Sequence, residues 1–196
     1  MATATKSQPG TVLRGIASGL FPMAGFTPVY ALWAIFAWPL PGSVFFAAAL
    51  TWSMYLLATA VRLISVSTAM PRDKTAFDAR IDKGISILSG VQGGLIVTAI
   101  VLLSVFSLAQ WIMPIVAGIV ALHFFFMPLL FGRTIDYYLG SVMLAFAIVG
   151  LLLTSAQTEW TTVWGVVGVG SACVTSAFGY YMVRAARLTL TEAVVK

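Results

Sequence analysis

The chain has 196 residues, of which 60% are hydrophobic and 9% are charged, and its formal net charge is +5. A water-soluble domain carries about 25% charged residues, so the composition excludes a soluble globular protein. Long apolar blocks fill the sequence, and a helix needs about 20 apolar residues to cross ~30 Å of hydrocarbon. A membrane β-barrel would instead show alternating segments of about ten residues, and none occur in the sequence. The sequence therefore predicts an all-α polytopic integral membrane protein, with residues 1–196 forming one transmembrane domain.

Six apolar blocks have the length of a membrane span, and short polar or proline-containing segments separate them. In chain order, the predicted spans cover residues 15–37, 43–67, 84–108, 111–131, 135–155 and 161–183. The first block is longer than the apolar part of a cleaved signal peptide and contains Pro22 and Pro28, so we expect it to be retained. Only "AQ" separates the third and fourth blocks, which predicts an antiparallel pair of helices.

The segment before the third block has the pattern of an amphipathic helix. Apolar residues recur at helical spacing at Phe77, Ile81, Ile85 and Leu88, which predicts that the third helix begins early, as a turn lying on the membrane surface. The charged residues of the segment would then face water or lipid headgroups; they are Asp78, Arg80, Asp82 and Lys83. We interpret the segment as a loop that fixes orientation, and a docking surface for a partner is the alternative.

The basic residues predict how the chain is threaded. With the N-terminus in the cytoplasm, six spans place every Lys and Arg on the cytoplasmic side, and the three external loops contain none. These residues are Lys6, Arg14, Arg62, Arg72, Lys74, Arg80, Lys83, Arg133, Arg184, Arg187 and Lys196. Because basic loops stay on the cytoplasmic side, we expect a protein of the cytoplasmic (inner) membrane with both termini cytoplasmic. The positive charge is accordingly a topology signal, and no nucleic-acid partner is predicted.

Catalytic and metal-binding patterns are absent from the sequence. Cys173 is the single cysteine and lies within the sixth span, which excludes an intramolecular disulfide and favours an inert packing role. The acidic residues, the histidine and the cysteine do not cluster at metal-ligand spacing, and no nucleophile–base pair or phosphate loop can be read. The sequence predicts no catalytic residue, no metal and no cofactor.

Small residues form stripes along several spans, each on one face of its helix. The stripes are Gly168–Ala172–Ser176, Gly15–Gly19 and Gly90–Gly94. Small residues let membrane helices approach closely. The Gly/Ala/Ser stripes therefore predict close packing within one subunit, or a seam between copies in a homo-oligomer.

His123 is the only histidine and lies in an apolar run, twelve residues from Trp111 and ten from Arg133. At about 1.5 Å per residue, it lies near the membrane midplane. Gln92 has a similar depth on the preceding span, nine residues from Lys83, so a hydrogen bond between the two side chains is predicted. Two interpretations stay open: a neutral histidine that joins two helices, and an intramembrane proton-handling site.

Prolines interrupt two of the predicted helices. Pro128 removes a backbone donor shortly after His123 and should kink the fourth helix. Pro22 and Pro28 interrupt the first helix, and Tyr30 lies beside the second of them. A broken first helix that faces a kinked fourth helix would enclose a polar pocket.

Two further residues stand out from their surroundings. Arg62 reaches the cytoplasmic interface and is interpreted as snorkelling to it, with an inward-pointing functional role as the alternative. Trp52 lies midway along its span, whereas the other tryptophans lie near the external ends; we interpret it as packing between helices or facing lipid, with ligand stacking as the alternative. The predicted binding residues are His123, Gln92, Arg62 and Tyr30.

The stretch LHFFFMPLLFGRTIDYYLG, residues 122–140, resembles a segment of small uncharacterised bacterial multi-span membrane proteins. In that segment a Leu-His-Phe precedes a Pro-Leu, and a Tyr-Tyr-x-x-Gly follows a short basic turn. The matching residues are Leu122, His123, Phe124, Pro128, Leu129, Tyr137, Tyr138 and Gly140. Two extra residues separate His123 from Pro128 in this chain. The resemblance implies a compact multi-span membrane protein and supplies no substrate.

These observations favour a non-enzymatic protein that binds or passes a small, mostly apolar or weakly charged solute, or a partner helix. The site would lie at the midplane near His123 and be formed by the first, third and fourth helices. Ion-coupled transporters usually carry a carboxylate within the membrane, and the sequence places Asp136 and Asp82 at its edge. The first alternative is a membrane-embedded enzyme acting on lipid at the cytoplasmic face. Its candidate residues around a headgroup are Arg62, Arg133, Asp136, Tyr137 and Arg184. The second alternative is a structural or partner-binding membrane subunit.

Overall fold

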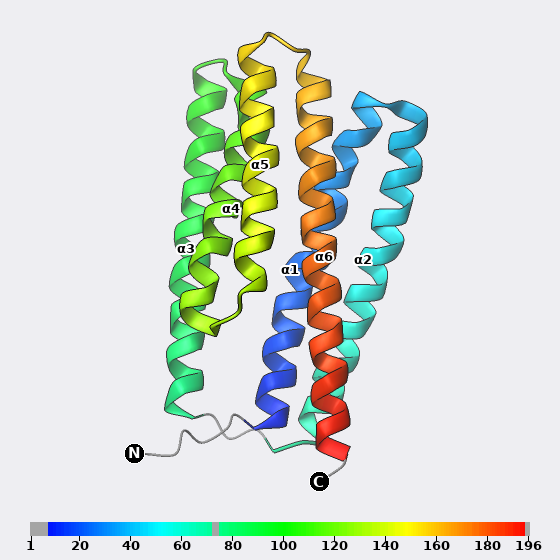
Figure 1. Ribbon diagram of the computed structural model, residues 1–196, viewed down its shortest axis with the longest axis vertical. Coiled ribbons are helices and arrows are strands. Elements are labelled where there is room, and N and C mark those ends of the chain that lie inside the picture. The colour runs from blue at the N-terminus through cyan, green and yellow to red at the C-terminus, as the bar shows by residue number, and fades with distance from the viewer. Residues whose placement is uncertain (1–7, 72–74, 195–196) are drawn as a thin grey trace.

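The computed structural model of the protein describes residues 8–71 and 75–194, and it consists of six long helices with short connections (Figure 1). The helices are α1 (Pro9–Ala37), α2 (Pro39–Thr68), α3 (Ala76–Val105), α4 (Ile112–Phe131), α5 (Ile135–Ser155) and α6 (Trp160–Val194), and a 3-10 turn, η1 (Ala109–Trp111), precedes α4. Each of these six helices is long and apolar enough to cross a membrane. The predicted all-α bundle of six spans is therefore confirmed, and the "AQ" break coincides with η1.

Helix α6 is the centre of the bundle. It packs against α1 and α2 on one side and against α4 and α5 on the other, while α3 packs against α4 at the outer edge (Figure 1). Within the described ranges, no Cα atom of α1 comes within 8 Å of a Cα atom of α3 or α4. Helix α6 therefore lies between α1 and α4 where they would otherwise pack directly, and the expected polar pocket between the first and fourth helices stays a prediction.

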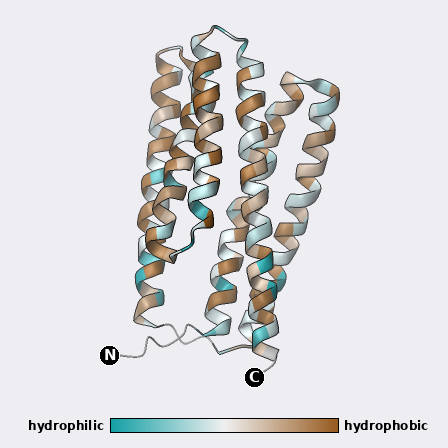
Figure 2. Cartoon of the chain, in the orientation of Figure 1, coloured by the Kyte–Doolittle hydropathy of each residue, from teal (hydrophilic) through white to brown (hydrophobic). Residues whose placement is uncertain are grey.

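The helices differ in length, and the longer ones extend further at one end of the bundle. Helices α4 and α5 have 20 and 21 residues, which is about 30 Å. The other four have 29 to 35 residues, and they extend past the α4–α5 turn at the end where α1 begins and α6 ends (Figure 1). Hydrophilic residues gather toward this end (Figure 2).

Helix α3 begins early, as predicted, but it does not lie on the membrane surface. Thr75 and Asp78 form a capping box, in which the Thr75 backbone N–H donates to Asp78 Oδ2 at 2.8 Å and the Asp78 N–H donates to Thr75 Oγ1 at 3.2 Å. Two N-terminal donors are thereby satisfied, and no proline interrupts the helix up to Val105, so it continues along one axis (Figure 1). Asp78 is only 9% exposed, which corrects the expectation that it faces water.

Close approach of α1 and α6 depends on glycines of α6. A Cβ atom added at Gly168 would lie 2.5 Å from the backbone oxygen of Tyr30, and one added at Gly165 would meet the side chain of Ala37. Two turns further along α6, the Thr175 hydroxyl is hydrogen-bonded to the Thr27 hydroxyl of α1 at 2.9 Å. The stripe predicted on this helix thus packs within one subunit. Cys173 is exposed on α6 and takes no part in this contact, and its inert role stays a prediction.

Candidate functional site

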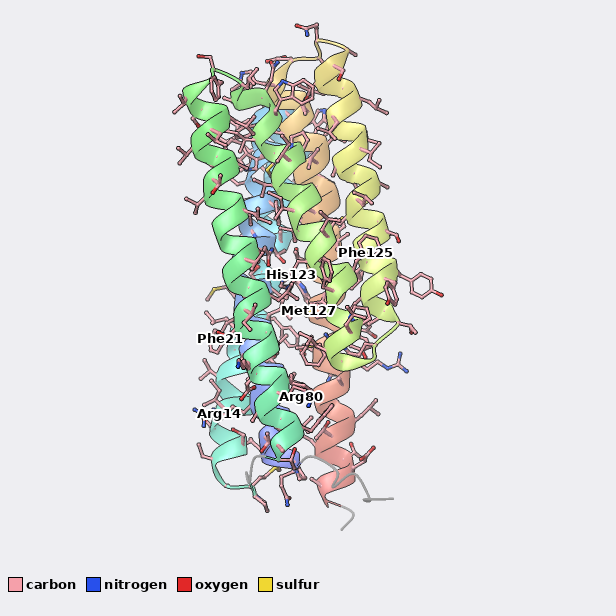
Figure 3. The ribbon with its side chains drawn as sticks, turned by 90° about the vertical axis from the view of Figure 1, so that its left-hand side faces the viewer. Arg14, Phe21, Arg80, His123, Phe125 and Met127 are labelled. Atoms are coloured by element: carbon pink, nitrogen blue, oxygen red, sulfur yellow. The ribbon has the colours of Figure 1, made fainter. Side chains whose placement is uncertain are left out.

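His123 extends from α4 toward α3 (Figure 3), and no hydrogen bond joins it to Gln92 among the described residues. The imidazole is half-buried, and its polar contact is with the backbone of Leu88 on α3. Its Nδ1 atom is buried and has no hydrogen-bond partner among the described residues. Gln92 is also half-buried on α3. Equal depth in the membrane therefore does not produce a contact here. A contact also requires that each side chain points from its own helix toward the other helix.

Tyr30 and Arg62 are placed away from His123. Tyr30 is buried in α1, with its ring 6.3 Å from that of Phe26 and its backbone against Gly168 of α6. Arg62 is exposed on α2, as its snorkelling interpretation predicts. Since α1 does not approach α3 or α4, the structure does not bring the four predicted binding residues into one constellation.

Asp136 is the polar residue whose burial the sequence analysis missed. It lies in the first turn of α5, and its side chain has 0% exposure. Arg133 Nε donates a hydrogen bond to Asp136 Oδ2 at 3.1 Å, whereas Asp136 Oδ1 has no partner among the described residues. Asp136 thus lies at the edge of its span as expected, but its burial corrects the expectation that it could meet a headgroup. The signal in the sequence is the three-residue spacing of Arg133 and Asp136.

Aromatic residues and a methionine surround the Arg133 guanidinium. Its Cζ atom lies 4.1 Å from the ring centroid of Phe131 and 5.4 Å from that of Phe178 on α6. One of its nitrogens lies 3.7 Å from the Met182 sulfur, also on α6. Stacking on aromatic faces stabilises a guanidinium that has lost part of its water. The ion pair is thus held between the α4–α5 turn and α6, with the arginine 20% exposed and the carboxylate fully covered.

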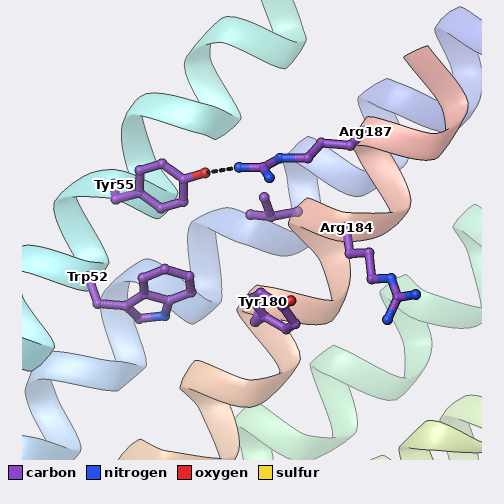
Figure 4. A pocket seen from close by; sticks show the side chains of 6 residues that line it. Trp52, Tyr55, Tyr180, Arg184 and Arg187 are labelled. Carbon is purple, nitrogen blue, oxygen red and sulfur yellow. Dashed lines mark hydrogen bonds between the residues drawn. The ribbon is translucent and has the colours of Figure 1, made fainter. Parts of the chain in front are cut away.

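A half-open groove of about 360 Å³ lies between α2 and α6 (Figure 4). Its lining consists of three aromatic residues, one apolar residue and two arginines: Trp52, Tyr55, Tyr180, Val183, Arg184 and Arg187. Trp52 stacks on Tyr55 with ring centroids 5.3 Å apart. Arg187 reaches across the groove and donates to the Tyr55 hydroxyl at 3.0 Å, and Arg184 lies on the other side of Tyr180 (Figure 4). The sequence signal for this groove is helical spacing, i, i+4 and i+7 for Tyr180, Arg184 and Arg187.

The fold and these buried polar groups define a multi-pass helical membrane protein with short connections. In the part of the chain that the structure describes, no three His, Cys, Asp or Glu side chains are grouped so that they could hold a metal ion. No family model matches the chain, and no curated protein or solved structure is significantly similar to it. The resemblance of residues 122–140 to bacterial multi-span proteins therefore stays a prediction.

Proposed function

We propose that the protein is a non-enzymatic protein of the cytoplasmic membrane that binds or passes a small polar solute, and that Asp136 takes up a proton during this process. The observation that carries the proposal is the fully buried carboxylate with one unpartnered oxygen. Ionisable residues inside membrane domains are costly to bury and usually mark proton or solute pathways. A buried polar atom without a partner is unusual in a folded protein and requires an explanation.

A proton is the ligand that suits Asp136 Oδ1. This atom has almost no accessible surface, so a hydrated ion would have to displace side chains, whereas a proton needs no cavity. Arg133 is the charged group that faces the carboxylate, and on its α6 side the guanidinium has the Tyr181 ring, with the ring centroid 5.9 Å from Cζ. Protonation would convert the ion pair into a neutral acid beside an uncompensated guanidinium. That guanidinium would then be available to a polar solute.

His123 supplies a second titratable group with an unpartnered nitrogen. Contacts between α4 and α5 link His123 to the Arg133–Asp136 pair. Gly140, one turn beyond Asp136 on α5, packs against Phe124 and the carbonyl of Ala121, which flank His123 in the sequence of α4. The histidine ring lies against α3, whereas Arg133 lies against α6. In our proposal, the solute contacts the midplane near His123, and a shift of α4 couples this contact to the Arg133–Asp136 pair.

The lipid-enzyme alternative has less support from the placement of its residues. It requires Arg133 and Asp136 at a headgroup together with Arg184, yet the first two are paired with each other and Arg184 lines the α2–α6 groove. Arg62 is exposed on α2, and Tyr137 is exposed on α5, whereas its sequence neighbour Asp136 is buried. The described residues thus do not gather an acid and a base around one lipid.

Proton uptake by Asp136 can be measured without knowing the solute. Infrared difference spectra of the purified protein between high and low pH should contain a carboxylic-acid band that Asp136→Asn removes. The matched control, Asp82→Asn on the exposed face of α3, should keep this band. Proteoliposomes that contain a pH-sensitive dye should then report proton movement when pools of small organic cations, anions, amino acids and sugars are added.

Two outcomes would contradict the proposal. The first is an unchanged carboxylic-acid band in a folded Asp136→Asn protein, which would show that another group binds the proton. The second is solute-driven proton movement that persists in this variant. If Asp136→Asn does not fold, the double variant Arg133→Gln/Asp136→Asn, which removes both charges, serves in the same measurements.

A further inference from the structure

The α2–α6 groove is a second polar feature, separate from the Arg133–Asp136 pair. Helices α2 and α6 both pack on α1, and they meet each other where the Leu56 side chain would contact a Cβ atom at Gly179. Val183 is 5% exposed, while Tyr55 and Tyr180 are 40% and 60% exposed. The groove therefore has a closed apolar floor and open aromatic sides.

The lining of the groove changes from aromatic and apolar at one end to cationic at the other. Tyr180 and Arg187 are seven residues apart on α6, which corresponds to about 10 Å along the helix axis. Trp52 and Tyr180 lie at one end, and the guanidinium of Arg187 crosses the other end toward Tyr55 (Figure 4). Arg187 lies closer to the end of α6, where hydrophilic residues gather (Figure 2). The apolar end of the groove thus points into the membrane, and the cationic end points toward its surface.

Among the residues that the structure describes, no acidic side chain lines the groove. Arg187 donates a hydrogen bond to the neutral Tyr55 hydroxyl, and Arg184 forms no hydrogen bond or ion pair within the described residues. An arginine offers five N–H donors and binds phosphate in a bidentate manner. Two arginines without a carboxylate, next to an aromatic wall, match a ligand that has an anionic head and an apolar tail.

We propose that this groove binds an anionic phospholipid of the leaflet on the side where α1 begins and α6 ends. The lipid phosphate accepts hydrogen bonds from Arg187, with the Tyr55 hydroxyl beside it, and the glycerol and acyl region lies on Trp52, Tyr180 and Val183. The Arg184 guanidinium points away from Tyr55 (Figure 4) and reaches the phosphate by a change of its side-chain rotamer. Interfacial Tyr and Trp rings suit this boundary because one end of each is polar. A free phosphate would use the arginines but would leave the aromatic wall without a partner. The site uses neither Asp136 nor His123.

The first experiment compares lipids and variants. Phosphatidylglycerol added to the detergent-purified protein should raise its melting temperature, and phosphatidylcholine should not. Each basic residue near an anionic surface contributes about 1 kcal/mol, so Arg184→Gln and Arg187→Gln should each weaken phosphatidylglycerol binding about five-fold. Arg80→Gln is the matched control, since Arg80 is exposed on α3 and lies outside the groove. Equal weakening by all three substitutions would overturn the proposal, because it would reflect overall charge.

The second experiment locates the lipid and identifies its source. Phosphatidylglycerol with brominated acyl chains should quench Trp52 fluorescence, which is obtained as the difference between the wild-type protein and Trp52→Phe. The Arg184→Gln/Arg187→Gln double variant should reduce this quenching while retaining its fold by circular dichroism. Inorganic phosphate and glycerol 3-phosphate should leave the melting temperature unchanged. Stabilisation by inorganic phosphate equal to that by the lipid, or quenching that does not depend on the arginines, would overturn a lipid site.

Discussion

At the scale of single residues, the burial of Asp136 follows from the length of a helix that is distant in sequence. Asp136 lies at the start of the α5 span, where a side chain normally reaches the interface. Helix α6, however, continues from Met182, beside Arg133, to Val194, which is about 18 Å further. The carboxylate is covered for this reason, and its neighbour Arg133 keeps a path to the surface, with 20% exposure.

The first prediction concerns the stability of this ion pair. Removing one partner of a buried pair typically costs about 3–5 kcal/mol, whereas removing both charges is often close to neutral. We expect Arg133→Gln to destabilise more than Asp136→Asn, because a lone guanidinium can turn toward water and the buried carboxylate cannot. The double variant should unfold later than Arg133→Gln alone. Denaturation in detergent measures this, and strictly additive effects of the two substitutions would contradict it.

The second prediction separates the two interpretations of His123. Because the ring is not bonded to Gln92, His123→Leu should lower stability by less than about 1.5 kcal/mol, as expected for a substitution that conserves volume. In our proposal the imidazole handles a proton, so His123→Leu and His123→Gln should both abolish solute-driven proton movement while melting near the wild-type temperature. Full activity of His123→Gln would show that titration is not required. A large stability loss in His123→Leu would restore the helix-joining interpretation.

At the scale of helices, α3 and α6 show opposite uses of glycine. Gly168 lets α6 lie against the backbone of α1, whereas Cβ atoms added at Gly90 and Gly94 of α3 would meet nothing within 4 Å. Asp78 is the buried residue of α3, and its other described residues are exposed or half-buried. A seam between copies of the chain at Gly90 and Gly94 stays a prediction, as does the role of a partner-binding subunit.

The third prediction compares the two glycine positions. Gly168→Ala should destabilise the protein by about 1–3 kcal/mol, the usual effect of overpacking, because the added methyl group meets the Tyr30 carbonyl. Gly94→Ala should leave stability unchanged or raise it by up to about 1 kcal/mol, since alanine is the better helix former. Unfolding in detergent provides the comparison. Equal effects would show that α1 and α6 do not approach each other as described.

The predicted seam between copies of the chain has its own test. A loss of oligomers in Gly94→Leu, measured by light scattering, would support the seam.

At the scale of the whole molecule, six spans place the beginning of α1 and the end of α6 on the same side (Figure 1). Arg14, Arg62, Arg133 and Arg184 lie on this side, each close to the end of the apolar part of its helix or turn. Lys6, Arg72, Lys74 and Lys196 lie outside the described residues. The opposite side has Trp33 against Trp164 with centroids 4.4 Å apart, and Trp164 donates to the Gln110 carbonyl at 3.1 Å. We propose on this basis that the arginine side is cytoplasmic.

The fourth prediction tests this orientation. A reporter that is active only in the cytoplasm should be active after Lys196 and inactive when inserted between Gln157 and Thr158, in the α5–α6 turn. The Pro39–Gly42 segment is unsuitable for insertion, because α2 already begins at Pro39 and Gly42 packs against the backbone of Ala34. The reverse pattern of activity would place both termini outside.

The candidate sites were predictable only in part. The spacing of Tyr180, Arg184 and Arg187 indicates one face of a helix, but no sequence pattern indicates that Trp52 and Tyr55 of α2 lie opposite this face. Likewise, counting residues from Trp111 and Lys83 assigns His123 and Gln92 a common depth. It does not determine the direction of either side chain around its helix, and a hydrogen bond needs both.

What the sequence by itself determined is the class of the protein, the number of spans and their approximate bounds, because each depends on local hydrophobicity and helix length. The asymmetry of Lys and Arg, from which the orientation is proposed, is likewise a property of the sequence alone. Only the tertiary structure decided that α6 lies at the centre, that α1 is kept away from α4, that Asp136 is buried and that a groove opens between α2 and α6. All membrane spans are similarly apolar, so hydrophobicity cannot choose their neighbours. That choice depends on shape, such as the smooth face of Gly165 and Gly168 on which α1 lies.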